Sequence, residues 1–153
     1  MLPRTVFAAP AAAPLALLSR TSAAQAGTGA CPSGAVCRWE HSNYNGRQAT
    51  SQIDNRDYGC PSIACGNQNR WDDGTTGLDN NVSSLNNAGA RCNLGVYSGS
   101  YESGADIFFG RPGSAYQHRD PYLPNGGGYT TVSMSVVNTS NFNDIISSHD
   151  FCP

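Results

Sequence analysis

The hydrophobic residues of this chain occur in short groups and not at helical spacing. Beyond residue 26, no window of about 11 to 18 residues keeps apolar residues at i, i+3, i+4 and i+7, because Gly, Asn and Ser interrupt every run. Short groups rich in β-branched and aromatic residues, with turn formers between them, are typical of strands. The pattern predicts strands at residues 35–40, 47–53, 94–100, 106–110 and 129–137.

Two segments between these strands are predicted to be loops. Residues 65–77 and 120–129 are rich in Gly, Asn, Asp and Pro, which favour turns over strand pairing. No linker divides the chain into two blocks of strands. We therefore predict an all-β fold, a small sandwich formed by one domain.

The first 26 residues have a different composition. Arg4 gives the start of the chain a positive charge, a run of Ala, Leu and Pro follows, and Ala24-Gln25-Ala26 fits a signal-peptidase site. The prolines in this run argue against a membrane helix. We interpret residues 1–26 as a secretory signal peptide and residues 27–153 as a single domain that is secreted.

The charge of the secreted part limits its partners. Cleavage would remove Arg4 and Arg20 from nine basic residues, which leaves seven against eleven carboxylates and a formal charge of −4. Every basic residue is Arg, and no two lie next to each other. An acidic chain without a basic run disfavours nucleic acid and anionic membranes as partners. We expect a monomer that binds neither.

All six cysteines lie beyond the predicted cleavage site. An even number in a secreted chain favours a disulfide framework, and neither close pair has the two-residue gap of redox or zinc motifs. Six cysteines allow many pairings, so the spacing alone leaves the connectivity open. The most economical set joins each close pair and the two that remain. The predicted bridges are Cys31–Cys37, Cys60–Cys65 and Cys92–Cys152.

A unit of two parts occurs twice along the chain. It begins with two aromatic residues and a glycine, the glycine seven positions after the first aromatic, and a glycine there permits a tight hairpin with positive φ. Some forty residues later comes a hexapeptide with two Asn or Asp, two free positions and two Ser. The first copy comprises Trp39, Tyr44, Gly46 and residues 79–84, and the second comprises Tyr97, Tyr101, Gly104 and residues 143–148.

This arrangement resembles the βγ-crystallin Greek-key motif, two of which form one domain. The stretches CPSGAVCRWEHSNYNGR and DNNVSSLNNAGARC resemble more narrowly the secreted βγ-crystallin-like proteins of peptidase inhibitor family I36. The resemblance covers the chain from Cys31 to Cys152. It implies a disulfide-bonded sandwich of two Greek-key motifs, and an inhibitor, not an enzyme. The second hairpin departs from the family, because Tyr101 comes one residue early and Glu102 stands where the family has an aromatic residue.

The resemblance also implies calcium as a cofactor. The hexapeptides carry amide, carboxylate and hydroxyl oxygens, which Ca²⁺ prefers, but one hexapeptide cannot supply about six to eight ligands. Related calcium-binding βγ-crystallins combine the hexapeptide of one motif with the hairpin of the other. Asn81 and Ile145 would act through their backbone carbonyls. The implied ligands are Glu40, Asn80, Asn81, Ser83, Ser98, Asp144, Ile145 and Ser147. The same polar side chains also satisfy turns without any ion, so this alternative stays open.

The inhibitory segment is expected just after the first hexapeptide, where the similar inhibitors also carry a cysteine. It comprises Arg91, Cys92, Asn93 and Leu94. A bridge to Cys152 would hold this loop in one conformation and reduce the entropy lost on binding. The expected partner is a secreted peptidase, with an extracellular metallopeptidase as the first choice. Peptidases of the thermolysin type prefer a large apolar residue after the cleaved bond, so Leu94, a different loop or a different class of peptidase remain alternatives.

No catalytic residues are predicted. The three histidines do not occur in a metallopeptidase motif, and serine is too common for one to stand out as a nucleophile. The alternative to an inhibitor is a calcium-stabilised, toxin-like module that binds a cell surface or a polysaccharide. Trp39 and Trp71 could stack on sugar rings in such a module, although buried packing is the commoner use of Trp in a small β domain.

Overall fold

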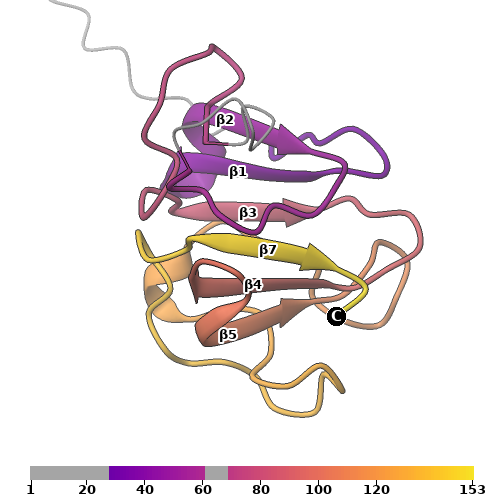
Figure 1. Cartoon of the computed structure of the whole chain (residues 1–153). Coiled ribbons are helices and arrows are strands. Elements are labelled where there is room, and N and C mark those ends of the chain that lie inside the picture. Colours follow the sequence, from indigo (N-terminus) through magenta and orange to yellow (C-terminus); the bar gives the residue numbers. More distant parts are fainter. Residues whose placement is uncertain (1–27, 61–68) are drawn as a thin grey trace, which may run out of the picture.

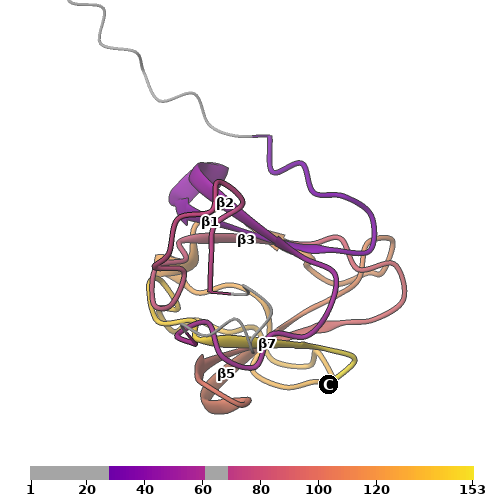
Figure 2. The same ribbon diagram turned by 45° about the horizontal axis from the view of Figure 1, so that its top comes forward.

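The computed structural model of the chain describes residues 28–60 and 69–153. The predicted signal peptide and Cys65 lie outside these residues. Two antiparallel sheets lie one above the other (Figures 1 and 2), which confirms the predicted all-β sandwich. The strand order is β2 (Asn45–Ser51), β1 (Val36–His41), β3 (Ser84–Asn87) and β6 (Arg119–Asp120) in the first sheet, and β5 (Ser103–Phe109), β4 (Leu94–Gly99) and β7 (Ser148–Phe151) in the second.

Each half of the chain contributes one segment to the sheet of the other half. β6 comes from the second half but pairs antiparallel with β3, where Asp120 lies opposite Leu85. In return, Asn55 from the first half bridges His149 of β7, with backbone hydrogen bonds of 3.0 and 2.8 Å. This exchange is the Greek-key crossing of the two motifs. Neither half has a complete sheet without a segment from the other.

The space between the sheets is filled by side chains from both halves. Trp71 is buried although it belongs to a predicted loop, and the Arg47 guanidinium lies 5.0 Å from the centre of its ring. The buried core comprises Val36, Ala49, Tyr58, Trp71, Leu78, Val82, Leu85, Leu94, Val96, Ile107, Phe109, Leu123, Phe142 and Ile146. Among the described residues, no helix has the length and apolar composition needed to cross a membrane.

The two hairpins share one backbone conformation. In the β1–β2 hairpin, which contains the 3-10 turn η1 (Ser42–Tyr44), positive φ angles occur at Asn43, Tyr44 and Gly46. The β4–β5 hairpin has them at Tyr101, Glu102 and Gly104. Glu102 is therefore the counterpart of Tyr44. Tyr44 packs edge-on against Trp39, whereas Glu102 forms an ion pair with Arg56 at 3.2 Å.

The strand predicted at residues 129–137 is wrong. This segment is a tight hairpin in which Thr130 N–H donates to Val136 C=O and Met134 has a φ of 56°. A left-handed residue in the middle reverses the chain and cannot continue a strand. The 120–129 segment, predicted to be a loop, contributes Asp120 to β6 and contains the 3-10 turn η3 (Leu123–Asn125).

β3 and β7 were not among the predicted strands. Both begin at the last serine of a hexapeptide and carry polar residues, so neither has the apolar alternation that marks a strand. β3 is nevertheless an inner strand, between β1 and β6, whereas β7 forms the edge of its sheet next to β4 and is bridged by Asn55 on its other side. Their polar side chains are buried and hydrogen-bonded to distant parts of the chain, as described below.

Two of the three predicted disulfides are confirmed. Cys31 is bonded to Cys37 and Cys92 to Cys152, with Cα–Cα distances of 5.7 and 4.9 Å. Cys60 is disulfide-bonded as well, and its predicted partner Cys65 lies outside the described residues. No cysteine in the described part of the chain is free.

Candidate functional site

The last serine of each hexapeptide fastens the hairpin of its own motif. The Ser84 hydroxyl donates to the His41 carbonyl at 2.8 Å and accepts from Tyr44 N–H at 3.1 Å. Ser148 makes the equivalent bonds in the second motif, to Gly99 O at 2.7 Å and from Glu102 N–H at 3.3 Å. These bonds hold the strained left-handed turns in place. The pattern is therefore structural at this position, with or without an ion.

The first serine of each hexapeptide contacts the hexapeptide of the other motif. Ser83 Oγ lies 2.8 Å from Glu40 O and 3.1 Å from Asp144 Oδ1. Asp144 N–H also donates to Val82 O at 3.0 Å. The structure thus brings together three oxygens that the resemblance names as ligands, one from the first hairpin and one from each hexapeptide. We call this cluster the first oxygen site.

The second hexapeptide repeats the crossing less completely. Ser147 Oγ lies 3.2 Å from Asn80 Oδ1, and Asn80 N–H donates to Ile146 O at 3.1 Å. Asn80 and Asp144 both have left-handed backbones, with φ of 53° and 55°. We call the Ser147 and Asn80 pair the second oxygen site. It differs from the first oxygen site in having an amide in place of the carboxylate.

The remaining predicted ligands do not offer their side chains to these sites. The Glu40 carboxylate is held by Arg47 at 2.6 Å, and this hydrogen bond lowers the pKa of Glu40, so only its backbone carbonyl faces Ser83. The Ser98 hydroxyl accepts from Ala105 N–H at 2.8 Å. Asn81 donates to Gly77 O, and Ile145 packs against the core. Asn81 and Ile145 were expected to act through their carbonyls only.

The donor set fits a hard cation of modest affinity. Every group in the two oxygen sites is an oxygen donor, which is the chemistry Ca²⁺ selects. Among the described residues, however, no group of three or more His, Cys, Asp or Glu gathers to hold a metal. The first oxygen site has one carboxylate, from Asp144, and the second has none. Calcium affinity falls with fewer charged ligands, so the first site is the stronger candidate.

The predicted inhibitory loop is fastened on both sides. Ala88 O accepts from Gly34 N–H at 2.7 Å, which joins the loop to the turn closed by the Cys31–Cys37 bridge. The buried side chain of Asn87 donates to Gly110 O at 2.8 Å and accepts from Gly89 N–H at 2.9 Å. Asn93 O accepts from Cys152 N–H beside the disulfide. The sequence did not single out Asn87, because a buried asparagine is indistinguishable there from a turn residue.

The side chains of this loop differ in accessibility. Arg91 is exposed, Cys92 and Asn93 are half-buried, and Leu94 is fully buried in the core. Arg91 makes no ion pair with any of the described residues. A partner that approaches this loop therefore meets Arg91 and Asn93, and it cannot reach Leu94 without opening the core.

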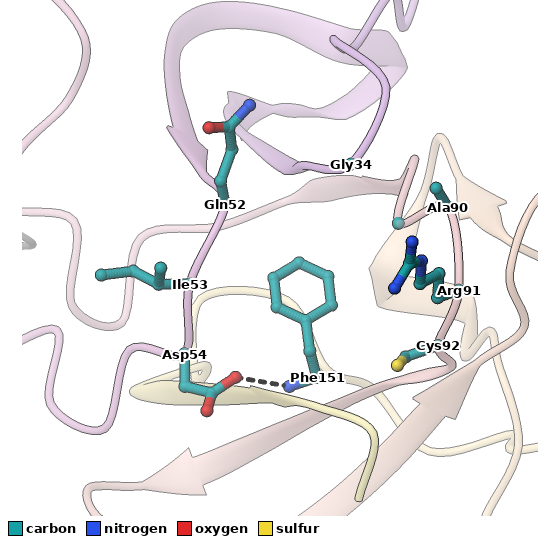
Figure 3. Close-up of a pocket in the computed structure, with 9 residues that line it drawn as sticks. Gly34, Gln52, Ile53, Asp54, Ala90, Arg91, Cys92 and Phe151 are labelled. Atoms are coloured by element: carbon teal, nitrogen blue, oxygen red, sulfur yellow. Dashed lines mark hydrogen bonds between the residues drawn. The ribbon is translucent and has the colours of Figure 1, made fainter.

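A cavity of about 360 Å³ lies beside the loop (Figure 3). Phe151 stands at its centre, with Arg91 on one side and Asp54 on the other, and Asp54 Oδ1 accepts from Phe151 N–H at 2.9 Å. Gly34 closes the cavity from the Cys31–Cys37 turn. The cavity places the apolar ring of Phe151 next to Arg91, which has no ion-pair partner among the described residues.

A buried polar cluster centred on His149 lies in the core and was not predicted. His149 Nδ1 lies 2.7 Å from the Tyr58 hydroxyl and 3.4 Å from the Arg38 guanidinium, and Nε2 lies 3.0 Å from Ile53 O. A carbonyl only accepts, so Nε2 carries the proton and Nδ1 accepts. Arg38 also donates to Ser51 Oγ at 2.7 Å. Burial and the Arg38 charge hold the pKa of His149 well below its usual value.

Comparison with protein families decides what kind of protein this is. The sequence model of peptidase inhibitor family I36 matches residues 24–107, more than half of the chain. The chain belongs to peptidase inhibitor family I36. This makes it a peptidase inhibitor and not an enzyme, and its partner a peptidase. The matched part of this I36 inhibitor includes the first hexapeptide and the loop at Arg91, but not the second hexapeptide.

A solved structure with a TM-score above 0.5 supports the same fold. A structure from a study of the evolution of the eye lens βγ-crystallin domain fold has a TM-score of 0.52 and 18% identity, and the match covers 82% of this chain and 92% of that one. A βγ-crystallin from Ciona intestinalis has a TM-score of 0.48 and 13% identity, over 77% and 99% of the two chains. At such low identity the likeness concerns the fold alone. A search of curated proteins found no significant match to the I36 inhibitor.

Proposed function

We propose that this I36 inhibitor is secreted and blocks an extracellular peptidase with the loop Arg91–Asn93. The observation that carries the proposal is the fastening of this loop by a disulfide, by the Asn87 side chain and by the Gly34–Ala88 hydrogen bond. A loop that is already ordered loses little conformational entropy on binding. Disulfides are typical of oxidising compartments, which supports secretion.

An extracellular metallopeptidase is the first target to test. Because Leu94 is buried, the side chain after Cys92 that meets the peptidase is Asn93. Peptidases of the thermolysin type prefer a large apolar residue after the cleaved bond, so the panel also includes serine and cysteine peptidases. Insoluble glycans serve as the comparison for the alternative surface-binding function.

The loop is tested by the variants Asn93→Ala and Arg91→Ala. Each should raise the inhibition constant by about tenfold or more, as expected for a residue near the centre of an interface, with the melting temperature nearly unchanged. Arg111→Ala is the matched control, since Arg111 is also exposed and makes no ion pair with any described residue. Wild-type protein that inhibits no peptidase at micromolar concentration but binds a glycan would refute the proposal.

We also propose that Ca²⁺ binds at the first oxygen site and stabilises the fold. The convergence of Ser83, Glu40 O and Asp144 supports this. When bound, the ion would replace the hydrogen bonds within this cluster and link the two motifs. Its role is structural, because the inhibitory loop follows the C-terminal end of β3 whereas Ser83 of the first oxygen site directly precedes the start of β3.

Calcium should raise the melting temperature only modestly. If the dissociation constant is in the extracellular range of about 10⁻⁴ to 10⁻³ M, millimolar Ca²⁺ adds on the order of 1 kcal/mol per site. Asp144→Asn removes the carboxylate while keeping a side chain that tolerates a left-handed backbone, and it should abolish most of the rise. Asp106→Asn on the exposed part of β5 is the control. Identical melting curves of the wild type in EGTA and in excess Ca²⁺ would leave the hexapeptides as turn formers.

A further inference from the structure

Residues Tyr129–Val137, which we call the valine hairpin, extend the second sheet beyond its edge strand. Tyr129 and Phe108 of β5 exchange backbone hydrogen bonds of 2.8 and 2.9 Å, and Tyr129 in turn bridges Val137. The sheet therefore continues from β7 through β4 and β5 into both arms of this hairpin. The hairpin lies beyond residue 107, outside the part of the chain that the family model matches.

The valine hairpin exposes an unusual amount of apolar surface. Val132, Val136 and Val137 are 49%, 53% and 61% exposed, and they are three of the seven large hydrophobic residues exposed in the described part of the chain. Val136 and Val137 are successive residues of the outer arm, so their exposed side chains lie on opposite faces and flank the free edge of this arm. A partner that pairs with this edge would contact both of them.

The hairpin is held in one conformation. Met134 is buried and anchors the tip, with its N–H donating to Thr131 O at 2.9 Å. The hydroxyls of Thr131, Ser133 and Ser135 lie 3.0 to 3.1 Å from one another and form a closed group. At the base, Asn138 N–H donates to Gly128 O at 3.0 Å. A partner would therefore meet an ordered surface, which limits the entropy lost on binding.

The outer arm of the hairpin also offers backbone groups. Val137 N–H and C=O make no hydrogen bond within the described residues, because the bonds to the inner arm are made by Val136 and Asn138. Unpaired groups on an outer strand are a template for pairing with another chain. An extended segment of a partner can add a strand to such an exposed edge through main-chain hydrogen bonds.

The register of the sheet places this arm near the inhibitory loop. Gly95, Phe108, Tyr129 and Val137 lie in one row across neighbouring strands. Three strand spacings of about 4.8 Å put Val137 about 15 Å from Gly95, which is three residues after Cys92. An interface of the usual size, about 800 Å² on each partner, is about 30 Å across and can cover both.

We infer that the valine hairpin is a second contact surface for the target peptidase, formed by its exposed valines and by the backbone of Val137. The inference rests on the proposed inhibitor function and extends it. The partner surface that fits is an apolar one with an available strand edge, beside the active-site cleft that receives Arg91–Asn93. The hairpin lies outside the residues that the family model matches. Contacts made by it would therefore select which peptidases this chain inhibits.

The test compares inhibition by wild type and by the double variant Val136→Thr and Val137→Thr. Thr has nearly the shape and strand preference of Val but replaces a methyl group by a hydroxyl. The inhibition constant should rise by about tenfold, mainly through faster dissociation, with an unchanged melting temperature. Tyr101→Asn is the matched control, because it removes an exposed apolar side chain from the β4–β5 hairpin, at the opposite end of β4 from Cys92.

The outcomes separate this inference from the proposed function. If the wild type inhibits a peptidase and the double variant has the same inhibition constant, the inference is wrong, while the proposed role of the inhibitory loop is unaffected. A wild type that inhibits nothing overturns both. Gel filtration adds a third arm, because a wild-type dimer that becomes a monomer in the variant, with inhibition unchanged, would show that the hairpin pairs with a second copy. Val137→Thr alone gives the same comparison if the double variant does not fold.

Discussion

Replacing Cys92 and Cys152 together by serine is expected to lower the free energy of unfolding by about 4 kcal/mol in the chain-entropy model. The bridge closes a loop with a sequence separation of 60, so its removal frees a long segment of the unfolded chain. It also loosens the inhibitory loop, which Asn93 and Cys152 otherwise hold by a backbone hydrogen bond. Chemical denaturation measures the first effect, and the inhibition constant at low temperature measures the second.

The Cys31–Cys37 pair is the control for this experiment. It has a sequence separation of only 6, so the same model gives its removal a cost of about 2 kcal/mol. The long bridge should therefore cost about twice as much as the short one. An equal or smaller loss for the Cys92 and Cys152 variant would contradict the entropic account. Loss of inhibition without loss of stability would instead show that the bridge only orders the inhibitory loop and does not stabilise the fold.

Acidification from pH 7.5 to 5 is expected to destabilise the fold through His149, by at most about 2 kcal/mol, the loss for a buried histidine that takes up no proton in this range. The unfolded histidine binds a proton below about pH 6.5, whereas the buried one does not because its pKa is lowered. Stability is therefore full above the unfolded pKa and falls as the pH drops below it. The groups around the ring are the Arg38 guanidinium, the Tyr58 hydroxyl, Ile53 O and the Phe151 ring, and none of them neutralises an imidazolium.

His149→Gln isolates this effect. The variant keeps hydrogen-bonding groups but cannot take up a proton, so its stability should be lower at neutral pH and flatter between pH 7.5 and 5. Burial raises the pKa of Asp120 and of Asp150, and these carboxyls act with the opposite sign, but the comparison with wild type cancels them. His41→Gln, on the exposed end of β1, should keep the wild-type slope. If the stability of this variant fell with pH as steeply as that of the wild type, His149 would be excluded as the cause.

The repeat was predictable because its signals are local. A glycine or asparagine that tolerates positive φ, two aromatics and a pair of serines can be recognised without knowing what lies opposite them. Those signals placed both hairpins and both hexapeptides correctly. Glu102 at the position of Tyr44 was also visible in the sequence, and the shared left-handed backbone confirms it.

The strands that follow the hexapeptides were not predictable in this way. β3 and β7 are polar in sequence but still form strands, because Ser84, Asn87 and His149 form hydrogen bonds with atoms up to about a hundred positions away. The valine hairpin gave the opposite error, a strand predicted where there is none. Its β-branched residues favour a strand, but the left-handed Met134 reverses the chain. Strand propensity reports local fit and says little about which backbone groups find partners.

By itself, the sequence determined the two-motif all-β plan, the close cysteine pair at Cys31 and the residues of the hexapeptides, because these depend on short-range backbone preferences and spacing. Only the tertiary structure decided which oxygens meet. Ser83 and Asp144 are 61 positions apart and come within 3.1 Å because the halves cross. It also decided that Leu94 is core while Arg91 and Val137 face solvent. Burial and long-range contact depend on how the sheets pack, which no local pattern encodes.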